Sequence, residues 1–90
     1  MLLLEFTVEP FVEGQPGPHV TAAIEAAEAI GGTVEVGPFG STCTAETEAM
    51  PEVIAALVKA AFQNGASHIS MHVARNDGWG DNGFRDGDAT

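Results

Sequence analysis

The first ten residues constrain the fold most strongly, because apolar and polar side chains alternate along them. One set of alternating residues is Leu2, Leu4, Phe6 and Val8, and the other is Leu3, Glu5, Thr7 and Glu9. Successive side chains of a β-strand point to opposite faces, so this pattern is typical of a half-buried strand. The sequence therefore predicts a sheet with one face in the core and another face that carries carboxylates and a hydroxyl group.

Two later stretches repeat apolar residues at helical spacing. The first begins at Pro18 and ends at Gly31-Gly32, and its apolar residues are Val20, Ala23, Ile24, Ala27 and Ile30. The second opens near Glu48 and ends at Asn64-Gly65, and its predicted buried stripe is Met50, Ile54, Leu57, Val58, Ala61 and Phe62. A glycine just after the last turn commonly ends a helix, which supports both boundaries.

Three further segments alternate in the manner of strands: residues 33–37, 39–46 and 67–75. The predicted order is strand, helix, strand, strand, helix, strand. Two interleaved strand-helix-strand units with right-handed crossovers give an α+β, ferredoxin-like βαββαβ sandwich. In this fold one four-stranded antiparallel sheet carries both helices on one face, and the first strand is internal and lies beside the last. The other face of the sheet receives no cover from its own chain.

The domain organisation follows from length and from a change of composition near the end. We expect residues 1–77 to form one ferredoxin-like domain and residues 78–90, rich in Gly and Asp, to be a mobile tail with Trp79 and Phe84 as its anchors. A 90-residue chain buries only about 60 to 65% of its unfolded surface. Its single Cys43 excludes an intrachain disulfide, so we expect a homo-oligomer to enlarge the core.

The charge is strongly negative, with 13 acidic residues against three basic ones and a net charge of -10. Nucleic acids and anionic membranes both require a basic surface, so neither is an expected partner. A negative field favours a small cationic ligand instead. No apolar run approaches the roughly 20 residues of a membrane span. The lone cysteine is typical of a cytoplasmic protein, which is the expected location.

The uncovered sheet face gathers the candidate binding residues. They are predicted to be Leu3, Glu5, Thr7, Glu9, Glu35, Thr42, Thr44, Glu46, His68, Ser70, His72 and Ala74. Hydroxyls, imidazoles and carboxylates in this mixture suit hydrogen bonding to a ligand or to a second sheet. Two hypotheses remain open at this point. The chain is a small-molecule binding protein, or it is a structural or regulatory oligomer whose open face is only a subunit interface.

Catalytic and metal sites are not predicted. Four residues along a strand separate the Cα atoms of His68 and His72 by roughly 13 Å, which is too far for one metal ion. Nothing in the sequence lowers the pKa of Cys43, so a buried strand cysteine is the expected state. Glu5 and Glu9 share a face, but no oxyanion element accompanies them. We therefore expect no enzyme, no catalytic residue and no cofactor.

Several short motifs, taken in order, resemble a known family. They are Glu5-Phe6-Thr7-Val8-Glu9-Pro10, then Pro38-Phe39-Gly40-Ser41-Thr42 leading to Glu46, then Gly65-Ala66 before the last strand and Asp77 after it. In order and spacing, from about Leu2 to Asp77, they are similar to the small thiamine-binding proteins of the MTH1187/YkoF-like superfamily, also called the DUF77 family. The order of the motifs within one βαββαβ unit carries the resemblance.

The resemblance implies a ferredoxin-like fold, assembly through sheet faces into dimers or tetramers, and binding of thiamine or its hydroxymethylpyrimidine moiety in uptake or salvage. The family's motif residues match here at Glu5, Thr7, Ser41 and Glu46. A carboxylate neutralises the thiazolium charge or accepts from the exocyclic amine, and hydroxyl groups complete the pattern. Thr44 and His72 join the predicted ligand-binding set from their places on the open face.

The sequence departs from the family pattern at two places. Gly40-Ser41 stands where Gly-Thr is usual, which keeps a hydroxyl group. Asp77-Gly-Trp-Gly replaces a basic stretch that often follows the aspartate, which argues against a phosphate-binding role at that position.

Overall fold

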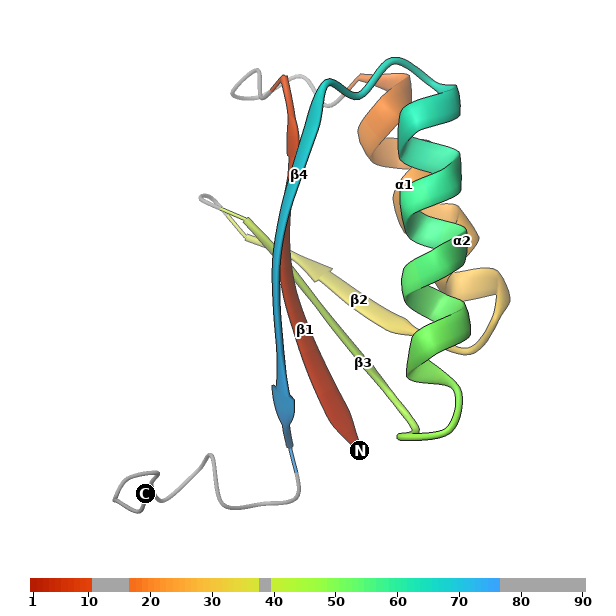
Figure 1. Ribbon diagram of the computed structural model, residues 1–90, viewed down its shortest axis with the longest axis vertical. Coiled ribbons are helices and arrows are strands. Elements are labelled where there is room, and N and C mark those ends of the chain that lie inside the picture. The colour runs from red at the N-terminus through yellow and green to blue at the C-terminus, as the bar shows by residue number, and fades with distance from the viewer. Residues whose placement is uncertain (11–16, 38–39, 77–90) are drawn as a thin grey trace.

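The computed structural model describes residues 1–10, 17–37 and 40–76, and it contains the six predicted elements in the predicted order. These are β1 (Leu2–Glu9), α1 (Pro18–Ala29), β2 (Thr33–Val36), β3 (Ser41–Ala45), α2 (Met50–Gln63) and β4 (His68–Arg75) (Figure 1). Residues 78–90, with Trp79 and Phe84, lie outside the described residues, so the prediction of a mobile tail stays a prediction.

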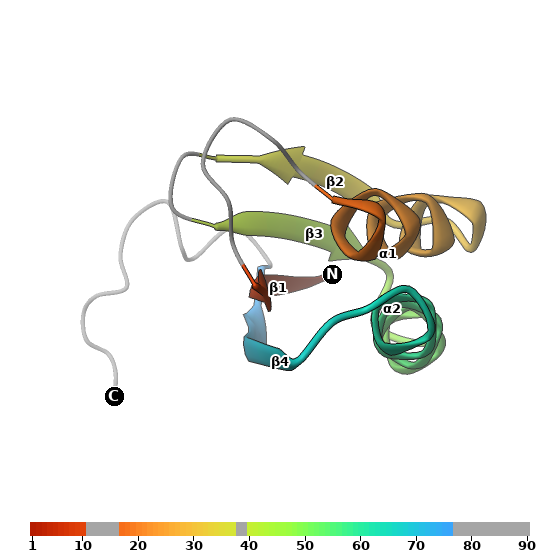
Figure 2. The same ribbon diagram turned by 90° about the horizontal axis from the view of Figure 1, so that it is seen from above.

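The four strands form one antiparallel sheet in the order β2-β3-β1-β4. β1 is internal and pairs with β3 on one side and with β4 on the other, as the fold prediction requires. Both helices lie on the same side of the sheet and pack against each other (Figure 2). The ferredoxin-like α+β fold is therefore confirmed, and no helix in the described part of the chain covers the opposite face of the sheet.

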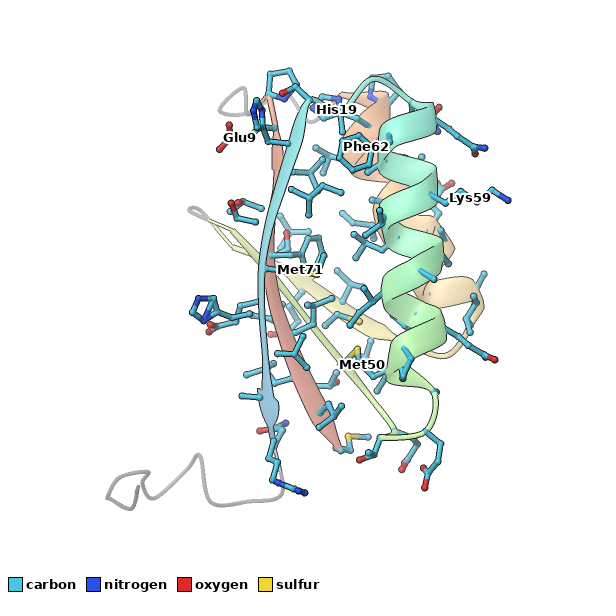
Figure 3. The ribbon with its side chains drawn as sticks, viewed as in Figure 1. Glu9, His19, Met50, Lys59, Phe62 and Met71 are labelled. Atoms are coloured by element: carbon cyan, nitrogen blue, oxygen red, sulfur yellow. The ribbon has the colours of Figure 1, made fainter. Side chains whose placement is uncertain are left out.

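The core lies between the sheet and the helices, and β1 contributes to it with the predicted set of alternating residues. Leu4, Phe6 and Val8 are buried, and side chains fill the space between the sheet and α2 (Figure 3). The helices contribute Ala23, Ala27, Met50, Val53, Leu57 and Ala61.

Two predicted core positions on the helices are wrong. Phe62 is 49% exposed and Ile30 is 40% exposed, whereas Val53, which the predicted stripe omitted, is fully buried. Phe62 lies in the last turn of α2, and Ile30 directly follows the last turn of α1. Helical periodicity alone does not show where a helix passes beyond the end of the layer that it covers.

The structure settles which side of β3 enters the core. Ser41, Cys43 and Ala45 are buried, while Thr42 and Thr44 are half-buried on the other face. The strand is shorter than the predicted 39–46. It ends at Ala45 because the carbonyl of Glu46 accepts hydrogen bonds from the N–H groups of Ala49 and Met50, both at 2.9 Å, and this turns the chain into α2.

Both helices end in the same hydrogen-bonded motif. In α1 the N–H of Gly32 donates to the carbonyl of Ala27 and the N–H of Gly31 donates to that of Glu28, with Gly31 at φ 103°. The equivalent positions after α2 are Ala66 and Gly65, with Gly65 at φ 106°. These are Schellman motifs, whose positive φ favours glycine. Neither helix of the described chain is long and apolar enough to cross a membrane.

Candidate ligand-binding site

The register of the sheet brings polar side chains of all four strands into one row on the open face. Glu5 is opposite Thr42 on β3 and opposite His72 on β4, while Thr42 is opposite Glu35 on β2. Directly opposite side chains on one face of a sheet lie about 4.5 to 5.5 Å apart at Cβ. The row Glu35–Thr42–Glu5–His72 therefore places two carboxylates, a hydroxyl group and an imidazole in line across the sheet.

A hollow of about 370 Å³ lies over the middle of this face. Its polar side chains come from three adjacent strands, β1, β3 and β4. Phe6, Ser41 and Met71 also line the hollow, but they occupy the alternate strand positions, whose side chains belong to the core side of the sheet. The lining residues are Glu5, Phe6, Thr7, Gly40, Ser41, Thr42, Ser70, Met71 and His72. The hollow is built on the flat of a sheet, so regular strands fix the positions of its polar groups.

Gly40 keeps one side of the hollow open. A Cβ atom at this position would lie 3.1 Å from Cγ2 of Thr7 and 3.4 Å from the carbonyl oxygen of Phe6. Both contacts are close to or inside van der Waals distance, so a side chain there competes for space with Thr7. The N–H of Gly37 donates to the carbonyl of Gly40 at 2.7 Å, which fixes the backbone just before β3.

The charge of the hollow comes from Glu5. Among the lining residues that the structure describes it is the one carboxylate, and its side chain is exposed. The other polar side chains there are hydroxyl groups, which donate and accept hydrogen bonds, and the imidazole of His72. The described part of the lining includes no Lys or Arg. This arrangement suits a ligand with a positive charge or with several hydrogen-bond donors.

The structure brings together four of the six predicted ligand-binding residues. Glu5, Thr7 and His72 line the hollow from the open face, and Ser41 also lines it although its side chain is buried on the core side of β3. Thr44 lies on the same sheet face, opposite Leu3, one row away from Glu5. Glu46 follows the end of β3 and does not line the hollow.

Five of the described lining residues are absent from the set predicted from the sequence: Phe6, Gly40, Thr42, Ser70 and Met71. Thr42 and Ser70 belong to the predicted open face but not to the predicted binding set, and Gly40 enters the sequence argument only as part of a motif. The register between strands identifies Thr42 and Ser70 as site residues, because each is directly opposite a residue of β1 in the predicted binding set. The strand pairing fixes that register, and the sequence alone leaves it open.

A second polar group lies at the end of β1 and serves the backbone. Ser67 donates from its N–H and from its hydroxyl group to the carbonyl of Glu9, at 2.7 and 3.2 Å, and Nδ1 of His68 lies 2.9 Å from Oγ of Ser67. These contacts tie the start of β4 to the end of β1. Among the residues that the structure describes, no three His, Cys, Asp or Glu side chains gather in the way a metal ion requires.

Cys43 lies on the helix side of the sheet, away from the hollow, and is fully buried. Burial raises the pKa of its thiol, and the Glu28 carboxylate adds to this, while a hydrogen bond from the backbone of Thr33 acts in the opposite direction. A thiol with a raised pKa is a poor nucleophile at neutral pH, because the reactive thiolate is scarce. The residue has the character of a small apolar core residue.

Comparison with known proteins gives matches among solved structures only. No family profile and no curated protein matches the sequence. The structure is similar to that of a domain of unknown function DUF77 from Bacillus cereus, with 19% identity, a TM-score of 0.47, and coverage of 81% of this chain and 71% of that one. It is also similar to an X-ray crystal structure of a Streptococcus pneumoniae protein, with 21% identity, a TM-score of 0.49, and coverage of 81% of both chains. The first of these bears the name of the family that the sequence motifs resemble.

Proposed function

We propose that this chain is a non-enzymatic small-molecule binding protein and that the hollow on the open sheet face takes thiamine or its hydroxymethylpyrimidine moiety. One observation carries the proposal. Glu5, the hydroxyl groups of Thr7, Thr42 and Ser70, and the imidazole of His72 converge on one hollow of about 370 Å³, whose described lining holds no Lys or Arg. This volume lies within the range of roughly 300 to 1,000 Å³ that is usual for small-molecule sites.

The chemistry of the hollow matches the polar groups of thiamine. The carboxylate of Glu5 accepts a hydrogen bond from the exocyclic amine of the pyrimidine or neutralises the thiazolium charge. The hydroxyl groups of Thr7, Thr42 and Ser70 donate to ring nitrogens, which need donors. His72, directly opposite Glu5, borders the bound ring on the β4 side.

The resemblance of the sequence motifs to thiamine-binding proteins supports the same ligand. It also supports assembly through sheet faces into a dimer or tetramer, in which a second sheet covers the hollow, and a role in uptake or salvage in the cytoplasm. The competing hypothesis is that the open face serves only as a subunit interface. That hypothesis predicts no small-molecule binding, which makes a binding measurement decisive between the two.

The test is isothermal titration calorimetry of the full chain with thiamine, hydroxymethylpyrimidine and thiamine monophosphate. We expect saturable binding of thiamine or hydroxymethylpyrimidine. Glu5→Gln is expected to weaken it by about 10-fold or more, because a hydrogen bond to a charged group contributes about 1.5 to 3 kcal/mol. Glu25→Gln is the matched control, because Glu25 is an exposed glutamate on α1, in the helix layer. Absence of binding for all three compounds would remove the proposed function.

A further inference from the structure

The chain has only three Lys and Arg residues, and the structure places two of them away from the hollow. Lys59 is exposed on α2 and points away from the sheet (Figure 3). Arg75 ends β4, three positions beyond His72. It shares the strand parity of Met71, which packs against the core, so its side chain leaves the strand on the helix side of the sheet. Arg85 lies outside the described residues.

The open face carries carboxylates instead. Glu5 lines the hollow, and Glu35 lies in the same row, on the far side of Thr42. Neighbouring strands are about 4.8 Å apart, so the Cα atoms of Glu35 and Glu5 are about 10 Å apart. At 0.1 M salt, charges are only partly screened over a distance of about 10 Å. The net charge of -10 adds to this negative field over the hollow.

The described chain also aims none of the usual phosphate-binding groups at the hollow. These groups are cationic side chains, helix N-termini and unpaired main-chain N–H groups. Both helices lie on the other side of the sheet (Figure 2). β1 and β3 each pair with a strand on both sides, so the ladders use their main-chain N–H groups. The side-chain donors in the described lining are hydroxyl groups and the imidazole of His72, which suit an alcohol better than a phosphate ester.

We propose that the hollow selects a ligand with a free alcohol and rejects the phosphate ester of the same compound. This inference rests on the proposed function and adds a limit on the charge of the ligand. A phosphate monoester carries about 1.5 to 2 negative charges at pH 7. In the hollow these charges share one surface with the carboxylate of Glu5, and the ester also loses its contacts with water. A ligand that has been phosphorylated is therefore not retained.

The first experiment compares two pairs of compounds on the full chain, so that Arg85 is present. The pairs are thiamine with thiamine monophosphate, and hydroxymethylpyrimidine with its phosphate ester, and calorimetry measures each dissociation constant. We expect the phosphate ester to bind about 10-fold more weakly than its alcohol, or weaker still. Equal or tighter binding of the esters would overturn this inference and leave the proposed function standing. Absence of binding for all four compounds would remove both.

The second experiment separates charge from size by changing the salt concentration. Raising sodium chloride from about 50 to about 300 mM shortens the range of charge interactions, so the preference for the alcohol should become smaller. A hollow that is merely too small for the ester would keep the same preference at both concentrations. A preference that does not change with salt would therefore contradict rejection by charge.

The third experiment changes the charge of the hollow itself. Ser70→Lys adds a cation at an exposed lining position of β4, and we expect it to reduce the preference for the alcohol about 10-fold. Glu5→Gln should also reduce the preference, because it removes the carboxylate that opposes the phosphate. Gln63→Lys is the matched control, because it adds the same charge at an exposed position of α2, in the helix layer. Its preference should equal that of the unaltered chain.

Circular dichroism shows whether each variant is folded. Folded Ser70→Lys and Glu5→Gln variants that keep the full preference for the alcohol would contradict the proposal. A Gln63→Lys variant that loses the preference as fully as Ser70→Lys would also contradict it, because the overall charge of the chain, and not the hollow, would then set the selection.

Discussion

Glu5 of β1 and His72 of β4 are direct cross-strand partners on the open face of the sheet, although 67 positions separate them in the chain. This pair lies at one end of the hollow, beside Thr42, and the pair Thr7 and Ser70 lies toward its other end. It is the geometric reason for assigning a ligand to this surface. The same pair links the ligand site to the free edge, because His72 belongs to the strand that has no neighbour on its outer side in the described chain.

Replacing His72 tests the β4 side of the hollow. His72→Ala removes an exposed imidazole, so the free energy of unfolding should change by no more than about 0.5 kcal/mol. Affinity for thiamine or hydroxymethylpyrimidine should fall several-fold, because the ring loses its contact beside Glu5. Calorimetry measures the affinity and thermal unfolding measures the stability. His68→Ala, on the same strand but outside the hollow, should leave the affinity unchanged.

Gly40→Ala tests whether the shape of the hollow matters. The added methyl group meets Cγ2 of Thr7 at 3.1 Å, so Thr7 has to move or the methyl group enters the hollow. We expect Gly40→Ala to lower the free energy of unfolding by about 1 kcal/mol. We expect it to weaken the free energy of ligand binding by a larger amount. Thr44→Ala is the comparison, since Thr44 lies on the same face but outside the hollow. Equal affinities for both variants would show that the ligand lies elsewhere.

The contact between α1 and β3 predicts that Gly32 tolerates no side chain. A Cβ atom there would lie 2.7 Å from Sγ of Cys43 and 2.9 Å from the carbonyl oxygen of Ala27. Gly32→Ala should therefore cost about 1 to 3 kcal/mol. For a domain of this size that lowers the melting temperature by roughly 4 to 8 °C for each kcal/mol.

Gly31→Ala separates crowding from backbone conformation. Gly31 has φ 103°, and a Cβ atom added there would meet no atom within 4 Å, so its replacement costs only the strain of the left-handed backbone, about 1 to 2 kcal/mol. Thermal unfolding should rank Gly32→Ala as the less stable of the two. The reverse order would show that the contact with Cys43 is not close.

Cys43 predicts a specific dependence of stability on pH. Burial raises the pKa of its thiol above the ordinary value, so the folded state favours the neutral form. The stabilisation is fully present below the thiol pKa of the unfolded chain, about 8.5, and is lost as the pH rises through the higher pKa of the folded state. Between pH 7 and 10 the unaltered chain should therefore lose more unfolding free energy than Cys43→Ala does.

A thiol reagent gives an independent measurement of the same residue. At pH 7 the folded chain should react slowly, and the chain in guanidinium chloride should react at the rate of a free cysteine. Rapid reaction of the folded chain would contradict the buried position of Cys43.

The fold was predictable because local patterns agreed with the global arrangement. The alternation in β1, the two helices and the glycines at Gly31-Gly32 and Gly65 each specify one element, and only a few arrangements satisfy that order of elements. Burial at the ends of the helices was less predictable, as Phe62 and Ile30 show. Both residues lie at the ends of their helices, and the helical period does not encode how much of a helix end the rest of the fold covers.

The candidate site was predictable in part, for a related reason. Glu5, Thr7 and His72 follow from parity along a strand, once the open face is known. Thr42 and Ser70 require the register between strands, and the hollow itself requires the shape of the backbone at Gly40. Glu46 matches a family motif, but the chain turns toward α2 at that residue and leaves the hollow.

The most direct test of the account is a nuclear magnetic resonance titration of the ¹⁵N-labelled full chain with thiamine and, separately, with hydroxymethylpyrimidine. The account predicts saturable shifts of the backbone amides of Glu5, Thr7, Thr42, Ser70 and His72, with little change along the exposed face of α1. Absence of shifts with both compounds, or shifts that cluster away from these five residues, would contradict it.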